Sequence, residues 1–404
     1  MGGTIDFAFS IGNEPDLWKI KTPAAQMGKD AVTLKRLLAD YNVGQQVFGP
    51  SWAHVSAQDA TDYVTQAVGH LDGYTVHNYP YGGKDCNVSK YFNKAPITQN
   101  LAASLASVVE AVHAINGGDS ILLTLEEVAC SSGGGCENVT DRFLAGFAWL
   151  TTLNTVAEAG FHRVHRQDIA GWSFAFGMSH YMLLGPAGWV NGSAELLTPH
   201  PDYFTTILFR QLVGQKLLFS NASGDASLLE GIDLHAWCSS PRSPAGTGGL
   251  TLTYVNFSPK DIAVALPDPL ASASGTLYSL TATAQGTSLQ SLQSDDMYLN
   301  GNLLTVDAEG RLPSFPLPGV PFSGGGKLTA PGFSYVSAPF PPTRTLYGPS
   351  SPPILTTPSH PPLFFFFFFF PCRAFSCSTG HSVCVQQRRP YRVHNLYYLM
   401  EKGV

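Results

Sequence analysis

The chain has 404 residues, of which 44% are hydrophobic and only 13% charged, and its formal net charge at pH 7 is −6. This length suffices for two or three domains with buried cores, and the negative balance argues against a surface for nucleic acid. Its seven cysteines show neither a disulfide framework nor paired zinc spacing, and no apolar run approaches the ~20 residues of a membrane helix.

Residues 5–215 alternate between short β-branched or aromatic runs and longer amphipathic runs. We expect strands near 6–13, 45–52, 73–79, 120–127 and 162–170, and helices near 24–41, 58–70, 97–117, 139–159 and 202–214. Repeated strand–helix units predict an α/β fold with a parallel sheet, as in a TIM-type barrel. A closed (β/α)8 barrel has eight units. We therefore expect a partial barrel over residues 1–216, whose first strands and any signal peptide precede Met1.

The pattern changes after residue 216. Short alternating segments follow, among them "LHAWCS", "LTLTYVNFS", "GTLYSLTA", "MYLNGNLLTV" and "GFSYVSA". Separated by turns rich in Gly, Pro and Ser, they predict an antiparallel β-sandwich over residues 217–340. Residues 341–404 are rich in Pro and Ser and contain seven consecutive phenylalanines, Phe364 to Phe370. We expect this low-complexity tail to be disordered or mistranslated.

Two of the predicted strands end in acidic turns. The first ends in "FSIGNEPDLW", with Asn13 and Glu14, and the fourth in "ILLTLEEVACSSGGGC", with Glu126 and Glu127. Because residues alternate in direction along a strand, we expect only one of the last two to point into the barrel mouth. Two carboxyl groups about 5–5.5 Å apart are the arrangement of a retaining glycosidase. A single Glu at a strand end is more often a solvated or capping residue.

The wider sequence context favours the glycosidase. Its segments are "GNEPDLW", "GKDAVTLKRLL" followed by "VFGPSW", "YTVHNYPYGG", "DRFLAGFAWLTTLN", "VHRQDIAGW" and "PDYFTTILFRQLVGQKLL". In their order and spacing they resemble the heparanases and heparanase-like proteins of glycoside hydrolase family 79, from about Ile11 to Tyr335. The resemblance implies a retaining hydrolase of β-glucuronides that needs no metal or organic cofactor.

The resemblance also implies roles for single residues. It places the nucleophile six residues before the triple glycine, at Glu127, which leaves Glu126 as an outward-facing neighbour and makes Glu14 the acid/base. Substrate-binding positions follow by the same matching: Gly133, Gly134 and Tyr181 at the sugar carboxylate, His77 and Tyr79 beside the nucleophile, and Gln167 elsewhere in the sugar site. Asn13 is placed to bind the sugar 2-hydroxyl. His180 stands where the family usually has Asn.

The substrate implied is a carbohydrate that contains glucuronic acid. The segment "GPSWAHVSAQ" lacks the basic residues that would hold a densely sulfated chain. We therefore expect a less charged glucuronide, on a polysaccharide, a proteoglycan or an aglycone. Two alternatives stay open: a glycosidase for neutral sugars, and an inactive, truncated carbohydrate-binding remnant.

Glycosylation sequons and cysteines bear on location. Sequons stand at Asn87, Asn138, Asn191, Asn221 and Asn256, which favours a secreted protein of the cell wall, the extracellular space or a lysosome- or vacuole-like compartment. Cys130 and Cys136 flank the glycine run. They form either a small disulfide or two free buried thiols.

Overall fold

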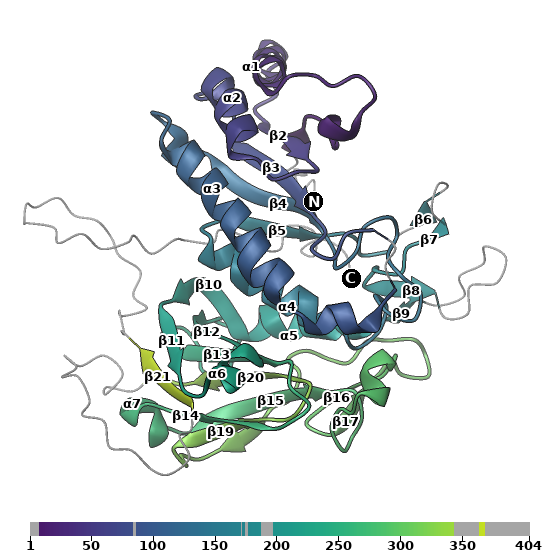
Figure 1. The fold of residues 1–404 in the computed structure, drawn as a ribbon, viewed down its shortest axis with the longest axis vertical. Coiled ribbons are helices and arrows are strands. Elements are labelled where there is room, and N and C mark those ends of the chain that lie inside the picture. Colours follow the sequence, from purple (N-terminus) through teal and green to yellow (C-terminus); the bar gives the residue numbers. More distant parts are fainter. Residues whose placement is uncertain are drawn as a thin grey trace, which may run out of the picture.

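A five-stranded parallel sheet in the order β1-β2-β3-β4-β5 forms the amino-terminal half of the structure (Figure 1). The structure, a computed structural model, describes residues 8–83, 86–170, 172–173, 177–186, 197–342 and 363–367. The strands are β1 (Ala8–Ser10), β2 (Gln46–Trp52), β3 (Gly73–Asn78), β4 (Leu122–Val128) and β5 (Arg163–Arg166). The predicted parallel half-barrel is confirmed, and all five strands lie where the hydrophobic runs predict them.

Helices connect these strands and lie along one side of the sheet (Figure 1). They are α1 (Ala24–Asp40), α2 (Ala57–Ala67), α3 (Ala102–His113), α4 (Ala145–Glu158) and α5 (Pro201–Leu212). The predicted third helix begins as a π-helical turn, η3 (Pro96–Leu101), and short 3-10 turns are η1 (Pro15–Leu17), η2 (Val88–Phe92), η4 (Gly118–Ser120) and η5 (Gln290–Gln293). Across the described ranges, none of the helices combines the length and apolar character needed to cross a membrane.

Strand β4 carries one residue more than either of its neighbours. Leu125 pairs with Val76 of β3, and Glu127 pairs with His77, so Glu126 has no partner in that register. The pairing with β5 shifts over the same residues. A β-bulge of this kind interrupts the alternation of side chains, which re-aims the residues at the end of the strand.

After β5 the chain forms two small hairpins before α5. They pair β6 (Trp172–Ser173) with β7 (Gly177–Met178), and β8 (Leu184–Pro186) with β9 (Leu197–Pro199). Between the two hairpins the backbone lies against the residues that follow β5, where Leu183 N–H donates to Asp168 O at 3.0 Å. This connection brings the segment that contains Tyr181 to the carboxyl end of the parallel sheet.

The carboxyl-terminal half consists of two further sheets. One has the order β10-β12-β13-β20-β15-β16-β17, with β18 beside β15, and the other β11-β21-β14-β19. Their strands are β10 (Val213–Leu218), β11 (Ser220–Ser223), β12 (Ile232–Ser239), β13 (Leu250–Asn256), β14 (Ile262–Ala265), β15 (Gly275–Thr281), β16 (Met297–Leu299), β17 (Asn302–Leu304), β18 (Val320–Phe322), β19 (Lys327–Ala330), β20 (Ser334–Phe340) and β21 (Leu363–Phe367). Two short helices, α6 (Ala226–Glu230) and α7 (Asp268–Ala271), connect them. All pairs in the two sheets are antiparallel except β14 with β21.

Two details of this half differ from the sequence pattern. Strand β10 crosses the predicted boundary at residue 216 and pairs with β12, so the sandwich takes its first strand directly after α5. Five residues of the tail, Leu363–Phe367, form β21 against β11 and β14, where we expected disorder. The remaining residues from 343 onward lie outside the described ranges.

Helices α4 and α5 lie between the parallel sheet and the sandwich (Figure 1). One core cluster runs through both halves, because buried residues of α4 and of β20 belong to it together. The ring of Tyr335 stacks on Phe143 with centroids 4.8 Å apart and meets Phe147 edge-on at 4.7 Å. The two halves are therefore held together by close aromatic packing.

Candidate active site

Glu14 lies directly after β1, where the chain turns into η1. It adopts a left-handed backbone conformation, with φ 50° and ψ 50°, and its N–H donates to Ser51 O at 2.8 Å. Asn13 precedes it, exposed, and its carbonyl oxygen accepts from Trp18 Nε1 at 3.0 Å. The turn is further fixed by Asp16, whose carboxylate accepts from the N–H groups of Ala53 and His54. Burial alone would raise the pKa of Asp16, but these hydrogen bonds hold it below its usual value.

The carboxyl groups of Glu14 and Glu127 approach each other across His77. The buried His77 ring places Nδ1 3.2 Å from Glu14 Oε1 and 3.7 Å from Glu127 Oε2. One ligand atom of each of the three side chains lies within 4.8 Å of the others. Both carboxylates stay about a quarter exposed, at 27% and 24%. The carboxyl ends of β1, β3 and β4 thus create a pair of acids open to solvent, whose spacing by itself would also suit a metal ion.

Tyr79 stands one residue beyond β3 and donates its hydroxyl hydrogen to Glu127 Oε1. Burial raises the pKa of Tyr79, and the hydrogen bond to Glu127 and the charge of that carboxylate raise it further. The phenol therefore stays protonated and remains a hydrogen-bond donor throughout the neutral range. Its ring centroid lies 6.1 Å from that of Tyr181.

Tyr181 and the glycine run converge on the same site. Burial raises the pKa of Tyr181, and hydrogen bonding with Tyr79 and with the Gly134 backbone opposes that rise. Gly133 and Gly134 have φ values of 68° and 89°, a region that residues with a Cβ rarely adopt. The structure thus brings Gly134 and Tyr181 together, with Gly133 directly before Gly134 in the chain, and their role at a sugar carboxylate stays a prediction.

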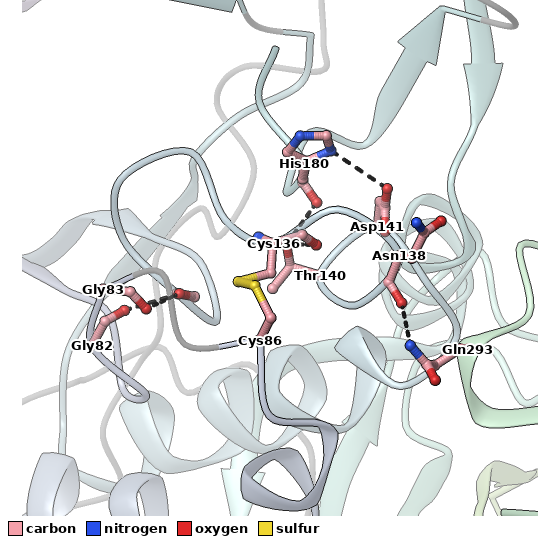
Figure 2. The surroundings of a disulfide bond; sticks show 10 residues. Gly82, Gly83, Cys86, Cys136, Asn138, Thr140, Asp141, His180 and Gln293 are labelled. Atoms are coloured by element: carbon pink, nitrogen blue, oxygen red, sulfur yellow. Dashed lines mark hydrogen bonds and ion pairs between the residues drawn. A yellow bond between two sulfur atoms is a disulfide. The ribbon is translucent and has the colours of Figure 1, made fainter. Parts of the chain in front are cut away.

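The substitution of His for Asn at position 180 leaves this arrangement intact, because the backbone makes the contacts. His180 N–H donates to Gly134 O at 2.7 Å, and His180 O accepts from Thr140 Oγ1 at 2.8 Å. The His180 side chain turns toward Asp141, with Nδ1 3.6 Å from Oδ2 (Figure 2).

Gln167 follows β5 directly, and its N–H donates to Val128 O at 3.0 Å. The preceding residue, Arg166, makes a buried ion pair with Asp202 at 2.5 Å and donates to Tyr181 O at 2.7 Å. Burial raises the pKa of Asp202, and the Arg166 guanidinium opposes that rise. Through these contacts the end of β5 holds the backbone of Tyr181 in place.

The predicted orientation of Glu126 is wrong. Its Oε2 accepts from Ser51 Oγ at 2.5 Å and from Ser10 Oγ at 3.1 Å. Ser51 Oγ also contacts Thr75 Oγ1, and Thr75 shares a face of β3 with His77. Glu126 therefore lies on the same face of the sheet as the acid pair, because the bulge in β4 removes the simple alternation on which the prediction rested.

Neither alternative for Cys130 and Cys136, a disulfide between them or two free thiols, is correct. Cys136 forms a disulfide with Cys86, 50 residues away (Figure 2). Cys130 is a free buried thiol. The loop after β3 reaches the glycine run because Ser131 Oγ donates to the carbonyls of Gly82 and Gly83, at 3.0 and 2.7 Å. Burial raises the pKa of Cys130 to about 12, which keeps it a thiol.

Asp168 is a site residue that the sequence reasoning missed. Burial raises its pKa, Arg166 opposes that rise, and Ser179 Oγ donates to Oδ1 at 3.3 Å. Its charge in turn contributes to raising the pKa of Tyr181, so Asp168 lies near enough to act on that tyrosine electrostatically. In the sequence, the signal that could have identified Asp168 is its position directly after Gln167.

Comparison with known proteins relates the chain to glycoside hydrolases. No protein-family model matches it. Heparanase of Mus musculus is 28% identical over 342 residues, 82% of this chain and 58% of the relative. Inactive heparanase-2 of Homo sapiens is 24% identical over 76% of this chain and 51% of the relative. Hyaluronoglucuronidase of Hirudo nipponia is 25% identical, over 76% and 58%. The chain thus spans between half and three fifths of the length of these relatives.

Solved structures support the same fold. The 4-O-alpha-L-rhamnosyl-beta-D-glucuronidase of Fusarium oxysporum 12S superposes with a TM-score of 0.53 at 16% identity, over 82% of this chain and 69% of the other. The alpha-L-arabinofuranosidase of Thermotoga maritima gives 0.50 at 12% identity, over 82% and 65%. These likenesses concern the fold alone. Together with the relatives, they make the chain heparanase-like in sequence and glycosidase-like in architecture.

Proposed function

We propose that this heparanase-like chain is a retaining glycoside hydrolase that cleaves β-glucuronides. Glu127 attacks the anomeric carbon while Glu14 protonates the leaving oxygen, and a glycosyl-enzyme forms. Water then hydrolyses this intermediate, with Glu14 as the base. His77 contacts both carboxylates, and the Tyr79 hydroxyl fixes Glu127 for attack.

The observation that carries this proposal is the approach of Glu14 and Glu127 to within 4.8 Å across His77. Retaining enzymes hold their carboxyl groups about 5–5.5 Å apart, whereas inverting enzymes leave about 6.5–9.5 Å for a water molecule. The short separation favours attack by the carboxylate itself. It also predicts that the product keeps its β configuration.

The convergence of Tyr181 with the glycine run supports a glucuronide. A phenol and backbone amides without a nearby Cβ suit the carboxylate of a uronic acid. Two relatives, the heparanase and the hyaluronoglucuronidase, carry names consistent with such substrates. We infer that the substrate is a glucuronide with fewer charges than a densely sulfated polysaccharide, because the protein itself has a net charge of −6.

Asp168 favours a second candidate, a glycosidase for neutral sugars. A carboxyl group whose charge acts on Tyr181 would, when ionised, repel the carboxylate of a glucuronate bound there. A glucoside or xyloside would avoid that repulsion, so both classes belong in the assay.

The disulfide between Cys86 and Cys136 supports a secretory or extracellular location. Such bonds persist mainly in oxidising compartments. We therefore propose that the protein is secreted to the cell wall or extracellular space, or delivered to a lysosome- or vacuole-like compartment.

The test is hydrolysis of 4-nitrophenyl β-D-glucuronide, β-D-glucoside and β-D-xyloside by the 404-residue chain. We expect glucuronide to be preferred, the first product to be the β anomer by NMR, and a chelator to leave the rate unchanged. Glu127→Gln should abolish turnover. The matched control is Glu137→Gln, an exposed residue beside the glycine run, which should keep full activity.

Three outcomes would contradict the proposal. Preference for glucoside or xyloside would favour the neutral-sugar enzyme. Equal turnover by the parent chain and Glu127→Gln would refute the nucleophile. Binding of a glucuronide by calorimetry without turnover by any preparation would favour a carbohydrate-binding protein.

A further inference from the structure

We propose that Glu126 is a positioning residue for the acid/base: it holds Ser51, which in turn holds Glu14. This inference rests on the proposed function. Neither the resemblance nor the names of the relatives assigns a role to this residue.

The carboxylate of Glu126 joins three strands beneath the acid pair. Its Oε2 accepts from Ser51 Oγ, at the end of β2, and from Ser10 Oγ, at the end of β1. The two hydroxyl oxygens lie 3.1 Å from each other. Hydrogen bonds to a charged acceptor are stronger than those between neutral groups. Glu126 therefore ties β4 to the two strand ends that define the position of Glu14.

Ser51 passes this constraint to Glu14 through its backbone. It is 2% exposed and has a left-handed φ of 59°, and its N–H donates to Thr75 Oγ1 at 2.8 Å. Its carbonyl oxygen accepts the N–H of Glu14 at 2.8 Å, and Glu14 has a φ of 50°. Two non-glycine residues with left-handed backbone conformations are thus hydrogen-bonded directly to each other. Such conformations persist only where surrounding contacts determine them, and Glu126 supplies one of those contacts.

Two variants separate the charge from the contact. Glu126→Gln keeps the size and an acceptor oxygen but replaces the carboxylate by a neutral amide. We expect a smaller loss of kcat than in Glu126→Ala, because a neutral acceptor still binds Ser51 but binds it more weakly. Glu126→Ala also frees Ser51, and we expect about a tenfold further loss of kcat.

The choice of leaving group makes the test specific to the acid/base. A poor leaving group needs the proton of Glu14 more than a good one does. Glu126→Ala should therefore slow hydrolysis of phenyl β-D-glucuronide several-fold more than that of 2,4-dinitrophenyl β-D-glucuronide. The charge-matched control is Glu110→Gln on the exposed side of α3, which should leave both kcat and this ratio unchanged.

Each result decides between the two proposals. If the parent chain hydrolyses no glycoside, the proposed function fails and this role fails with it. If the parent chain is active while both Glu126 variants keep its kcat and leaving-group ratio, this inference alone is overturned. A loss of activity that only follows a loss of folded protein, with an unchanged leaving-group ratio, overturns it as well.

Discussion

The hydrogen bond that Tyr79 donates acts directly on the proposed nucleophile. Its hydroxyl donates to Glu127 Oε1, and its raised pKa keeps it a donor at the pH of any assay. A hydrogen bond to a charged group contributes roughly 1.5–3 kcal/mol. We therefore expect Tyr79→Phe to lower kcat/KM by about 10- to 100-fold across the pH range, with little change in folding.

Tyr81 provides the control for that measurement. Its hydroxyl donates to Asn93 O at 3.0 Å, away from the acid pair. Tyr81→Phe removes a phenolic hydroxyl as well, and we expect activity within about twofold of the parent chain. An equal loss in both variants would mean that Tyr79 acts through stability alone.

The glycosylation sequons differ in whether their asparagine is accessible on the folded chain. Asn256 is fully buried, and its Nδ2 donates to the carbonyls of Lys260, Ala330 and Pro331. Asn87 is exposed, next to the disulfide. On expression through a eukaryotic secretory pathway we expect a glycan at Asn87 and none at Asn256, measured by mass spectrometry of enzymatically deglycosylated peptides. A glycan at Asn256 on folded protein would contradict the packing of β13.

The position of Glu126 was beyond the reach of sequence pattern. Period-two alternation places Glu126 and Glu127 on opposite faces, and that rule holds only while strand registers stay matched. The extra residue in β4 is visible only in its pairing with β3 and β5. By contrast, strand ends alone predicted that Glu14 and one of Glu126 and Glu127 would lie together, because each follows or ends a parallel strand. The resemblance to the heparanase family supplied His77 and the choice of Glu127.

At the scale of elements, the parallel half followed from hydrophobic runs because β2, β3 and β4 are largely buried and α1, α2 and α3 each bury one face. Short strands such as β14, β18 and β19 were missed, since three or four residues give too little alternation to recognise. The disulfide was missed for a different reason. Cys86 and Cys136 are 50 residues apart, and only the folded loop after β3 brings them together.

That disulfide fixes the glycine run beside the acid pair. Cys136 follows Gly135 directly, and a Cβ on Gly135 would lie 2.4 Å from Thr140 Oγ1, so the run has little room to rearrange. We expect Cys86→Ser with Cys136→Ser to raise KM for a glucuronide several-fold and to change kcat less, because binding of the sugar carboxylate depends on those amides. Steady-state kinetics on glucuronide and glucoside would show the effect.

Cys130→Ala is the matched control for the disulfide variant. Its thiol is free and buried near the same run, so its removal tests packing without the cross-link. We expect KM to stay within about twofold. If the double variant kept the parent KM, the cross-link would have no part in holding the sugar site.

At the scale of the whole molecule, the sequence predicted both halves but not how tightly they join. Lys94, before η3, donates from Nζ to the carbonyls of Leu229 and Ile232, which lead into β12. Asn154 of α4 accepts from Trp237 Nε1 and donates to Asp233 Oδ2, at 3.2 and 3.3 Å. These contacts join residues 79 to 138 positions apart, a separation at which no local pattern carries information.

Tyr335 of β20 tests whether the two halves unfold as one. Its buried ring packs on Phe143 and Phe147, and its hydroxyl donates to Phe143 O. Tyr335→Ala, which removes a large buried aromatic ring, should cost about 3–5 kcal/mol. Tyr335→Phe removes one hydrogen bond from the Phe143 carbonyl, which also accepts the Gly146 N–H at 3.2 Å, and should cost about 0.5–1.5 kcal/mol. Because one core joins α4 to the sandwich, we expect unfolding to remain a single transition when it is followed by tryptophan fluorescence and by far-UV circular dichroism. Both variants should lower the midpoint of that transition.

The control is Tyr41→Ala, at a side chain 75% exposed, whose free energy of unfolding should stay within about 0.5 kcal/mol of that of the parent chain. Separation of the two signals into distinct transitions in Tyr335→Ala would mean that the halves fold independently and that the aromatic contact only docks them.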